Sequence, residues 1–114
     1  MPLAFQEYDH VVHKIQIELG DFAAPTPFKK VSIELPRGAE IIHVDNQKEI
    51  ATFWYNRAVG DIPFVKRNIY MFATGQVISK NLQRMYYVGT VLFKGGDIVC
   101  HFYSGYEEGT TFGV

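Results

Sequence analysis

The stretch Val31-Ser-Ile-Glu-Leu-Pro-Arg-Gly-Ala-Glu-Ile-Ile-His-Val44 decides the fold class, because it encodes a strand, a turn and a second strand within fourteen residues. Apolar and polar side chains alternate over residues 31–35, as they do in a strand with one buried face. Pro36 and Gly38 interrupt this pattern, and residues 40–44 resume it. The stretch therefore predicts a β-hairpin.

The same alternation recurs along most of the chain, with turn-forming residues between the segments. We expect seven strands, at residues 11–19, 31–35, 40–44, 50–57, 66–74, 84–93 and 97–103. Residues 45–48 (Asp-Asn-Gln-Lys) are expected to form one turn, and Lys94-Gly95-Gly96 the last one. Residues 20–28, which hold two prolines, and residues 59–65 and 76–83 are expected to be loops. This pattern predicts an all-β fold, either a small antiparallel β-sandwich or a partly open barrel.

Length and composition indicate one folded domain. The 114 residues carry 47% hydrophobic and 15% aromatic side chains, which suffices for a core without metal or disulfide support. We expect a single domain over residues 1–114, with its core at 11–103 and a mobile tail at 104–114. The later predicted strands have large apolar residues on both faces, as at Trp54 between Phe53 and Tyr55. A thin sandwich cannot bury both faces, so we expect an aromatic pocket or a subunit interface.

Charge and cysteine content exclude several classes of partner. A formal net charge of −1 provides no general field for long nucleic acid or an anionic membrane. The single Cys100 excludes an internal disulfide and a cysteine-rich zinc site. No apolar run approaches the roughly 20 residues of a membrane helix, and the first ten residues do not look like a signal peptide. We therefore expect a soluble intracellular protein.

Six segments, in this order, resemble a widespread group of small phage and bacterial proteins that are generally described as a domain of unknown function. They are Ile33-Glu-Leu-Pro-Arg-Gly-Ala-Glu-Ile-Ile42, Thr52-Phe-Trp-Tyr55, Ala73-Thr-Gly-Gln-Val-Ile78, Tyr87-Val-Gly-Thr-Val91, Gly95-Gly96 and Val99-Cys-His-Phe102. The resemblance covers residues 12–103. The sequence departs from the group at Gln76, where His is expected, and at Cys100, where an aromatic residue is expected.

The resemblance implies a phage origin more directly than it implies an activity. Phage β-proteins of this size include sponges that sequester the cyclic nucleotide signals of bacterial immunity, such as those of anti-CBASS systems. The chain is similar in kind to such proteins. This would place it in the cytoplasm of the bacterial host.

Two segments are candidates for reading a nucleotide base. Trp54 could stack a purine, and packing in the core is the alternative explanation for an aromatic residue on a strand. Thr74-Gly75-Gln76 offers a hydroxyl, an unshielded backbone and an amide to a base edge or a phosphate. The alternative is an ordinary turn at the end of a strand.

Cations for a phosphate are available at Lys14, Arg37 and Arg67, since Arg binds phosphate in bidentate geometry and Lys acts as a point charge. For each of them, a position on a solvated face is the alternative. The four histidines lack the spacing of metal ligands, so no metal site is expected. Cys100 and His101 are adjacent, and neighbouring strand residues point to opposite faces, which disfavours a nucleophilic pair.

These observations lead to one hypothesis and one alternative. We expect a phage counter-defence protein that is not an enzyme, has no cofactor and sequesters a small, cyclic nucleotide as a homodimer or higher homo-oligomer. Trp54 would stack the base, Thr74, Gly75 and Gln76 would read its edge, and Lys14, Arg37 or Arg67 would neutralise the phosphate. The alternative is a structural or assembly protein of the phage particle, which would use the same aromatic surfaces to contact another protein.

Overall fold

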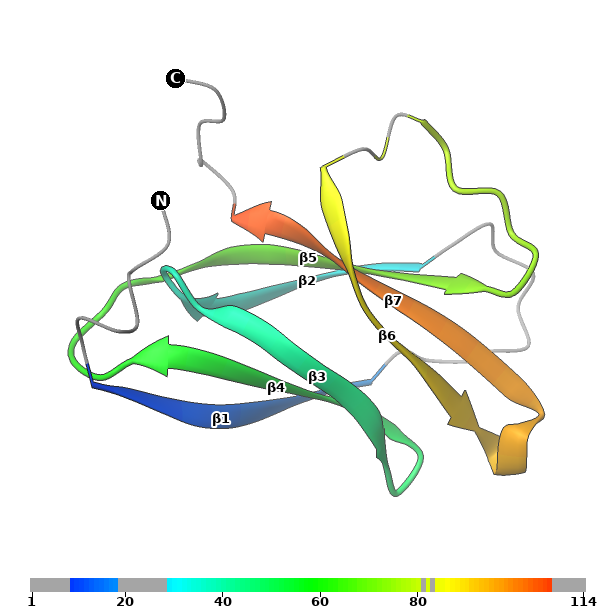
Figure 1. Cartoon of the computed structure of the whole chain (residues 1–114), viewed down its shortest axis with the longest axis horizontal. Helices are drawn as coiled ribbons and strands as arrows, with labels where there is room; N and C mark the ends of the chain where they lie inside the picture. Colours follow the sequence, from blue (N-terminus) through cyan, green and yellow to red (C-terminus); the bar gives the residue numbers. More distant parts are fainter. Residues whose placement is uncertain (1–8, 19–28, 81, 83, 108–114) are drawn as a thin grey trace.

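Two antiparallel sheets packed face to face make up the computed structural model, which describes residues 9–18, 29–80, 82 and 84–107 (Figure 1). The strands are β1 (His10–Ile17), β2 (Lys29–Pro36), β3 (Glu40–Gln47), β4 (Ile50–Ala58), β5 (Phe64–Ala73), β6 (Met85–Phe93) and β7 (Ile98–Glu107). A short 3₁₀ turn, Lys94–Gly96, joins β6 to β7. The prediction of a small all-β sandwich is confirmed, and the sheets do not close into a barrel.

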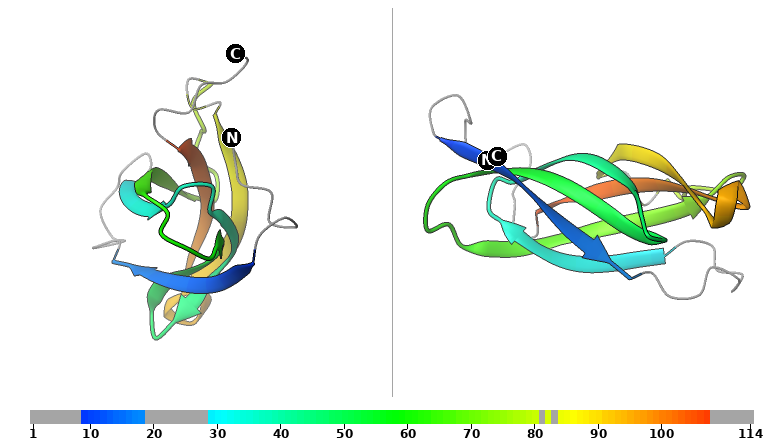
Figure 2. Two further views of the ribbon diagram at one scale, coloured as in Figure 1. Left: turned by 90° about the vertical axis from the view of Figure 1, so that its left-hand side faces the viewer. Right: turned by 90° about the horizontal axis from the view of Figure 1, so that it is seen from below.

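The sheets contain three and four strands, in the orders β1-β4-β3 and β2-β5-β7-β6. The chain crosses between the sheets after β1, β2 and β4, so each sheet combines strands from distant parts of the sequence. Seen end-on, the strands of both sheets curve around one interior (Figure 2). Among the described residues, no helix has the length and apolar character needed to cross a membrane.

The core lies between the two sheets and is built from alternate residues of each strand, as the sequence pattern predicts. Phe53 of β4 and Phe102 of β7 are fully buried and meet edge to face, with ring centroids 5.3 Å apart. This contact joins the central strand of one sheet to a central strand of the other. Burial of two phenyl rings contributes about 1.5–3 kcal/mol for each ring.

The edge strands β3 and β6 approach each other closely where the two sheets meet. A Cβ atom on Gly89 would lie 2.9 Å from Cγ1 of Val44, so any larger residue at this position of β6 would force the Val44 side chain to shift. Further along, Nδ2 of Asn46 donates a hydrogen bond to the Leu92 carbonyl over 3.1 Å. The Lys94 amide donates to Oε1 of Glu49. The tips of the β3–β4 and β6–β7 hairpins are therefore connected.

The turn predicted at residues 45–48 begins three residues later, at Lys48. β3 continues to Gln47, and Lys48 and Glu49 form the turn with φ angles of 54° and 64°. Two successive left-handed residues are typical of a type I′ hairpin turn, which usually contains Asn or Gly. Here Asn46 lies at the end of β3, before the turn. Its Oδ1 accepts a hydrogen bond from the Glu49 amide over 2.7 Å and so stabilises the turn.

The last strand is also longer than predicted, because β7 runs to Glu107 and includes four residues assigned to the mobile tail. The reason is the Glu107 carboxylate, which accepts hydrogen bonds from the Gly38 amide and from Arg67. Residues 108–114 of the predicted tail and the predicted loop at 20–28 lie outside the described residues.

Candidate ligand-binding surfaces

A row of tyrosines crosses the outer face of the four-stranded sheet. Tyr70 of β5 pairs with Tyr103 of β7, which pairs with Tyr87 of β6. Lys30 of β2 pairs with Tyr70 and extends the row to the opposite edge. Directly opposed residues of antiparallel strands share a face, and the alternate residues of these strands form the core. We call Tyr70, Tyr103 and Tyr87 the tyrosine row.

The rings of this row are held by aromatic contacts and by a glycine. Tyr103 makes edge contacts with Tyr87 and with Phe72, at centroid distances of 5.5 and 5.6 Å. A Cβ atom on Gly105 would lie 3.4 Å from Cε2 of Tyr70, so this ring lies beside a residue without a side chain. Tyr87 is 55% exposed, whereas Tyr70 and Tyr103 are half-buried. The row therefore presents ordered aromatic rings to solvent.

A chain of polar groups runs beside the tyrosine row. The hydroxyl of Tyr87 bonds to Oγ1 of Thr90, which lies 2.9 Å from Nδ1 of His101. Nε2 of His101 lies 2.7 Å from Oγ1 of Thr74. A neutral imidazole has one donor and one acceptor nitrogen, so one threonine donates to the ring and the other accepts from it. The surface thus combines aromatic rings with oriented hydroxyls.

The segment Thr74-Gly75-Gln76 forms the turn that follows β5. Gly75 has a φ angle of 89°, and the Gln76 amide donates to the Ala73 carbonyl over 3.1 Å. Oε1 of Gln76 accepts a hydrogen bond from the Ala73 amide over 2.7 Å. The Gln76 side chain is therefore engaged in closing the turn, while the Thr74 hydroxyl reaches the polar chain beside the tyrosine row.

Trp54 lies on the outer face of the other sheet. It is half-buried on β4 between Lys14 of β1 and His43 of β3 in the strand register. The Trp54 and His43 rings are 5.5 Å apart and inclined by 40°, and Nζ of Lys14 donates to Oε1 of Gln47 over 2.9 Å. The structure brings Trp54 and Lys14 together. It does not bring either of them to Thr74, because the outer faces of the two sheets point away from each other (Figure 1).

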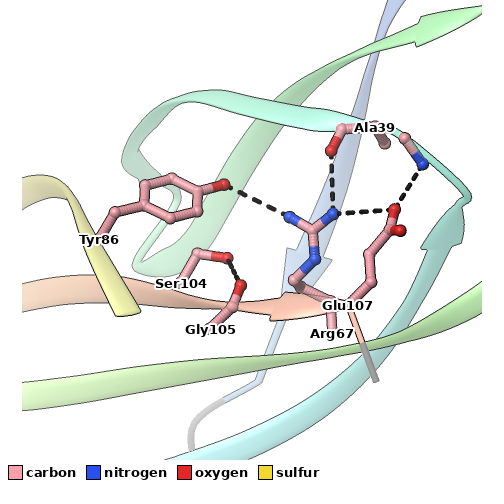
Figure 3. Close-up of polar contacts among 7 residues, drawn as sticks. Ala39, Arg67, Tyr86, Ser104, Gly105 and Glu107 are labelled. Carbon is pink, nitrogen blue, oxygen red and sulfur yellow. Dashed lines mark hydrogen bonds and ion pairs between the residues drawn. The ribbon is translucent and has the colours of Figure 1, made fainter. Parts of the chain in front are cut away.

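Arg67 lies inside the sandwich and is 4% exposed. Its Nη2 atom donates to the Ala39 carbonyl over 2.9 Å and to Oε1 of Glu107 over 3.3 Å, and Nη1 donates to the Tyr86 hydroxyl over 3.3 Å (Figure 3). The Nε atom is buried and has no hydrogen-bond partner among the described residues. A guanidinium that already pairs with Glu107 at this depth is poorly placed to meet a phosphate.

The third predicted cation, Arg37, is exposed on the turn between β2 and β3, and its amide donates to the Pro63 carbonyl over 2.8 Å. The three cations predicted for a phosphate thus occupy three separate environments. Arg37 lies on a turn, Lys14 on a sheet face and Arg67 in the interior.

The described residues contain no group of three His, Cys, Asp or Glu side chains that could hold a metal ion. Burial raises the pKa of the Cys100 thiol to about 11, although nearby Lys29 opposes this shift. The thiol is therefore protonated at neutral pH. It faces the core, whereas His101 faces the outer surface beside the tyrosine row.

The tyrosine row as a whole was not identified from the sequence. The alternation of Tyr70 and Phe72 placed these two side chains on one face, but the partners on β6 and β7 depend on the pairing register. That register includes a bulge between Tyr87 and Gly89, which no local sequence pattern specifies. Knowledge of the β5–β7 and β6–β7 pairings would have been the signal that connects the three tyrosines.

Comparison with known proteins gives no functional assignment. No curated protein and no solved structure matches the chain. A match to a family of proteins extends over residues 9–112, from the residue before β1 to beyond the end of β7. The chain belongs to this family, which is described as "Domain of unknown function (DUF7352)".

Proposed function

We propose that this protein binds a small nucleotide on the tyrosine row and catalyses no reaction on it. The observation that carries the proposal is the alignment of Tyr70, Tyr103 and Tyr87 on three adjacent strands, next to the hydroxyls of Thr74 and Thr90. Adjacent strands are about 4.8 Å apart, so the row is roughly 10 Å long. Four-stranded sheets that bind RNA stack two or three bases on aromatic residues in a similar way.

The chemistry of the row suits a base with a polar edge. Stacking on an aromatic side chain contributes about 1–3 kcal/mol per base, and each hydroxyl can donate to or accept from the base edge. Lys30 lies at the end of the row, where it would neutralise a phosphate locally. A local cation is needed because the chain has a net charge of −1 and no general attraction for anions.

The biological role that we propose is that of a phage counter-defence protein that sequesters a cyclic nucleotide immune signal in the cytoplasm of the bacterial host. Its support is the resemblance of the sequence to small phage proteins, together with the aromatic surface. Sequestration requires affinity and abundance but no turnover, because the bound fraction depends on the dissociation constant and on the protein concentration.

The proposal is tested by thermal unfolding of the purified protein with a panel of cyclic mono-, di- and trinucleotides. A ligand at 100-fold above its dissociation constant should add about 2.7 kcal/mol to the free energy of unfolding. Tyr103→Leu should reduce this shift because it removes the central ring and weakens binding. Tyr106→Leu is the matched control, since Tyr106 is 45% exposed on β7 and contacts Tyr86 outside the row. No shift with any nucleotide contradicts the proposal, and recovery of a cleaved nucleotide would indicate an enzyme.

A structural or assembly protein of the phage particle is the second candidate. The observation that favours it is the exposure of apolar side chains away from the tyrosine row, with Val12 50%, Ile42 48% and Leu92 56% exposed. Where exposed apolar side chains form a contiguous patch, that patch is a site for contact with another protein. Detection of the chain in purified virions by mass spectrometry would support this function over sequestration.

A further inference from the structure

The polar chain beside the tyrosine row is a continuous series of hydrogen bonds with His101 near its centre. The Tyr87 hydroxyl bonds to Thr90, Thr90 bonds to Nδ1 of His101, and Nε2 of His101 bonds to Thr74. Tyr87, Thr90 and Thr74 are exposed, and His101 is half-buried. We call Thr74 and Tyr87 the two ends of the polar chain. Both ends are open to a ligand that lies on the tyrosine row.

The number of hydrogens in the polar chain limits what it can donate to a ligand. Three hydroxyls and one neutral imidazole carry four polar hydrogens, and their three mutual contacts use three of these. If Nε2 of His101 carries the proton, the remaining hydrogen is that of Thr74, and Tyr87 can only accept from a ligand. If Nδ1 carries it, Thr74 can only accept. A neutral polar chain therefore cannot donate at both ends.

Protonation of His101 changes this count. An imidazolium donates through both nitrogens, so both threonines accept from the ring. Thr74 then keeps its hydrogen at one end, and the hydrogen of Thr90 or of Tyr87 remains at the other. Hydroxyls that accept from a charged donor are polarised and become better donors themselves. The protonated polar chain thus donates at both ends and carries a positive charge.

We propose that His101 determines which nucleotides the tyrosine row binds: its protonation lets the polar chain bind a second phosphate and so favours cyclic di- and trinucleotides over cyclic mononucleotides. This inference rests on the proposed function and adds a substrate class and a pH dependence to the same site. A base stacked on the row takes one donor of the polar chain through an acceptor on its edge. The second donor, together with the charge, suits a phosphate oxygen.

The phosphate at the polar chain is distinct from the one at Lys30. Lys30 lies opposite Tyr70 on β2, at the far edge of the sheet, where it serves one phosphate. The polar chain runs from the end of β5 across β7 to β6, a width of two strand spacings or roughly 10 Å. A cyclic mononucleotide has one phosphate and cannot supply both places. Cyclic di- and trinucleotides can.

The charged groups of this face do not pair with His101. Within the described part of the chain, His101 takes part in no ion pair. Its closest neighbours in the strand register are Thr90 of β6 and Phe72 of β5, and Tyr103 follows it on the same face of β7. The charged residues on the outer face of this sheet are Lys30, Glu34 and Lys66. The described connecting segments at its ends add Lys80, Arg84, Lys94 and Asp97.

Histidine is the side chain whose charge ordinarily changes between about pH 5 and about pH 8, whereas carboxylates titrate lower and lysine and tyrosine higher. A change of affinity in this range that depends on the polar chain therefore points to His101.

The test measures dissociation constants of cyclic mono-, di- and trinucleotides at about pH 5 and about pH 8 by isothermal titration calorimetry. Cyclic nucleotides are phosphodiesters, so they lack the titration near about pH 6 of a phosphate monoester. We expect a cyclic di- or trinucleotide to bind about tenfold more tightly at the lower pH, which corresponds to about 1.4 kcal/mol. The affinity of cyclic mononucleotides should change much less.

His101→Gln tests the residue itself. Glutamine keeps a donor and an acceptor but gains no proton, so this variant should still bind at the higher pH and lose the gain at the lower pH. His43→Gln is the matched control, because His43 is exposed on the outer face of the other sheet and undergoes the same chemical change. It should keep the pH dependence. Thermal unfolding at both pH values establishes that each variant folds.

Equal affinities at the two pH values overturn the inference and leave the proposed function intact. A gain at the lower pH that persists in His101→Gln, or that is as large for cyclic mononucleotides, overturns it as well. If no cyclic nucleotide binds at either pH, the proposed function fails and the inference fails with it. A gain for cyclic di- or trinucleotides that is lost in His101→Gln and kept in His43→Gln supports it.

Discussion

The outer faces of the two sheets are built differently, although both carry aromatic residues. The four-stranded sheet aligns three tyrosines from three strands and connects Tyr87 to a polar chain through Thr90 and His101. The three-stranded sheet has a single Trp54, which lies between a lysine and a histidine. The first face offers several stacking positions, and the second offers one. Strand register, rather than proximity in sequence, therefore brings the aromatic side chains together on one surface.

The largest expected effect comes from Arg67, the residue of the four-stranded sheet whose side chain is buried inside the sandwich. Arg67→Ala leaves Glu107 buried and without its ion-pair partner, and should lower the free energy of unfolding by about 3–5 kcal/mol. Arg57→Ala is the control on the other sheet. Arg57 is only half-buried and donates to the carbonyls of Ala58 and Gly60. Urea unfolding should show a loss of no more than about 1.5 kcal/mol for this control.

Equal losses from the two arginine variants would mean that the interior pair has no special role. In that case Arg67 would also do little to position the tyrosine row. Its connection to the row is the hydrogen bond to the hydroxyl of Tyr86, the residue next to Tyr87.

A direct comparison of the two faces uses matched aromatic substitutions. Tyr103→Leu should weaken binding of the nucleotide found in the panel by about 1–3 kcal/mol for each stacked base. Trp54→Leu should leave the affinity unchanged if the tyrosine row is the site. Isothermal titration calorimetry measures both. The reverse result would place the ligand on the three-stranded sheet, at the tryptophan that was predicted from the sequence.

A smaller effect is expected from the polar chain beside the tyrosine row. Thr74→Val preserves the shape of the side chain and removes the hydroxyl that bonds to Nε2 of His101. The affinity for the nucleotide should fall by about 0.5–1.5 kcal/mol, the net contribution of one hydrogen bond. Nitrogen NMR of the imidazole reports whether the tautomer of His101 has changed. If the affinity is unaltered but the tautomer has changed, the polar chain positions the His101 ring and does not bind the nucleotide.

The smallest effect concerns Glu49, which links the hairpins of the two sheets. The pKa of Glu49 is lowered by hydrogen bonds from Asn46 and from the Lys94 amide. Because the folded pKa is below the unfolded value, the carboxylate stabilises the fold above the unfolded pKa, and this stabilisation is lost as the pH falls through the folded pKa. Glu49→Gln should therefore be less stable than the parent at pH 7.

The difference between Glu49→Gln and the parent should become smaller in acid, below the ordinary pKa of a glutamate. Urea midpoints at pH 7 and pH 3 measure this dependence. Glu40→Gln, an exposed acid on β3, serves as the control for a general change of charge. If both variants respond to pH alike, the link between the hairpins does not contribute to stability.

The fold was largely predictable because it depends on local alternation. All seven strands were located, since a period of two residues and turn-forming residues mark each one. The errors lie where a side-chain hydrogen bond, which the alternating pattern does not reveal, determines the outcome. The turn at Lys48 depends on Asn46, and the last residues of β7 depend on Arg67.

The candidate site was much less predictable than the fold. Trp54 and Lys14 were predicted to share a ligand, and the structure places them side by side. Thr74 was assigned to the same ligand but lies in the turn after β5 of the other sheet, because the sequence does not specify which strands pair. The position of Arg67 was missed for a related reason, since a charged residue on a strand is usually exposed.

The close approach of Gly89 and Val44 implies that the two sheets of the sandwich are held together along one pair of edge strands, β3 and β6. There the two sheets are joined backbone against side chain, whereas no described strand bridges β1 and β2 on the opposite side. Local opening of the sandwich should therefore begin between β1 and β2, on the side where no described contact of this kind joins the two sheets. Amide hydrogens of β1 should then exchange with solvent faster than those of β6.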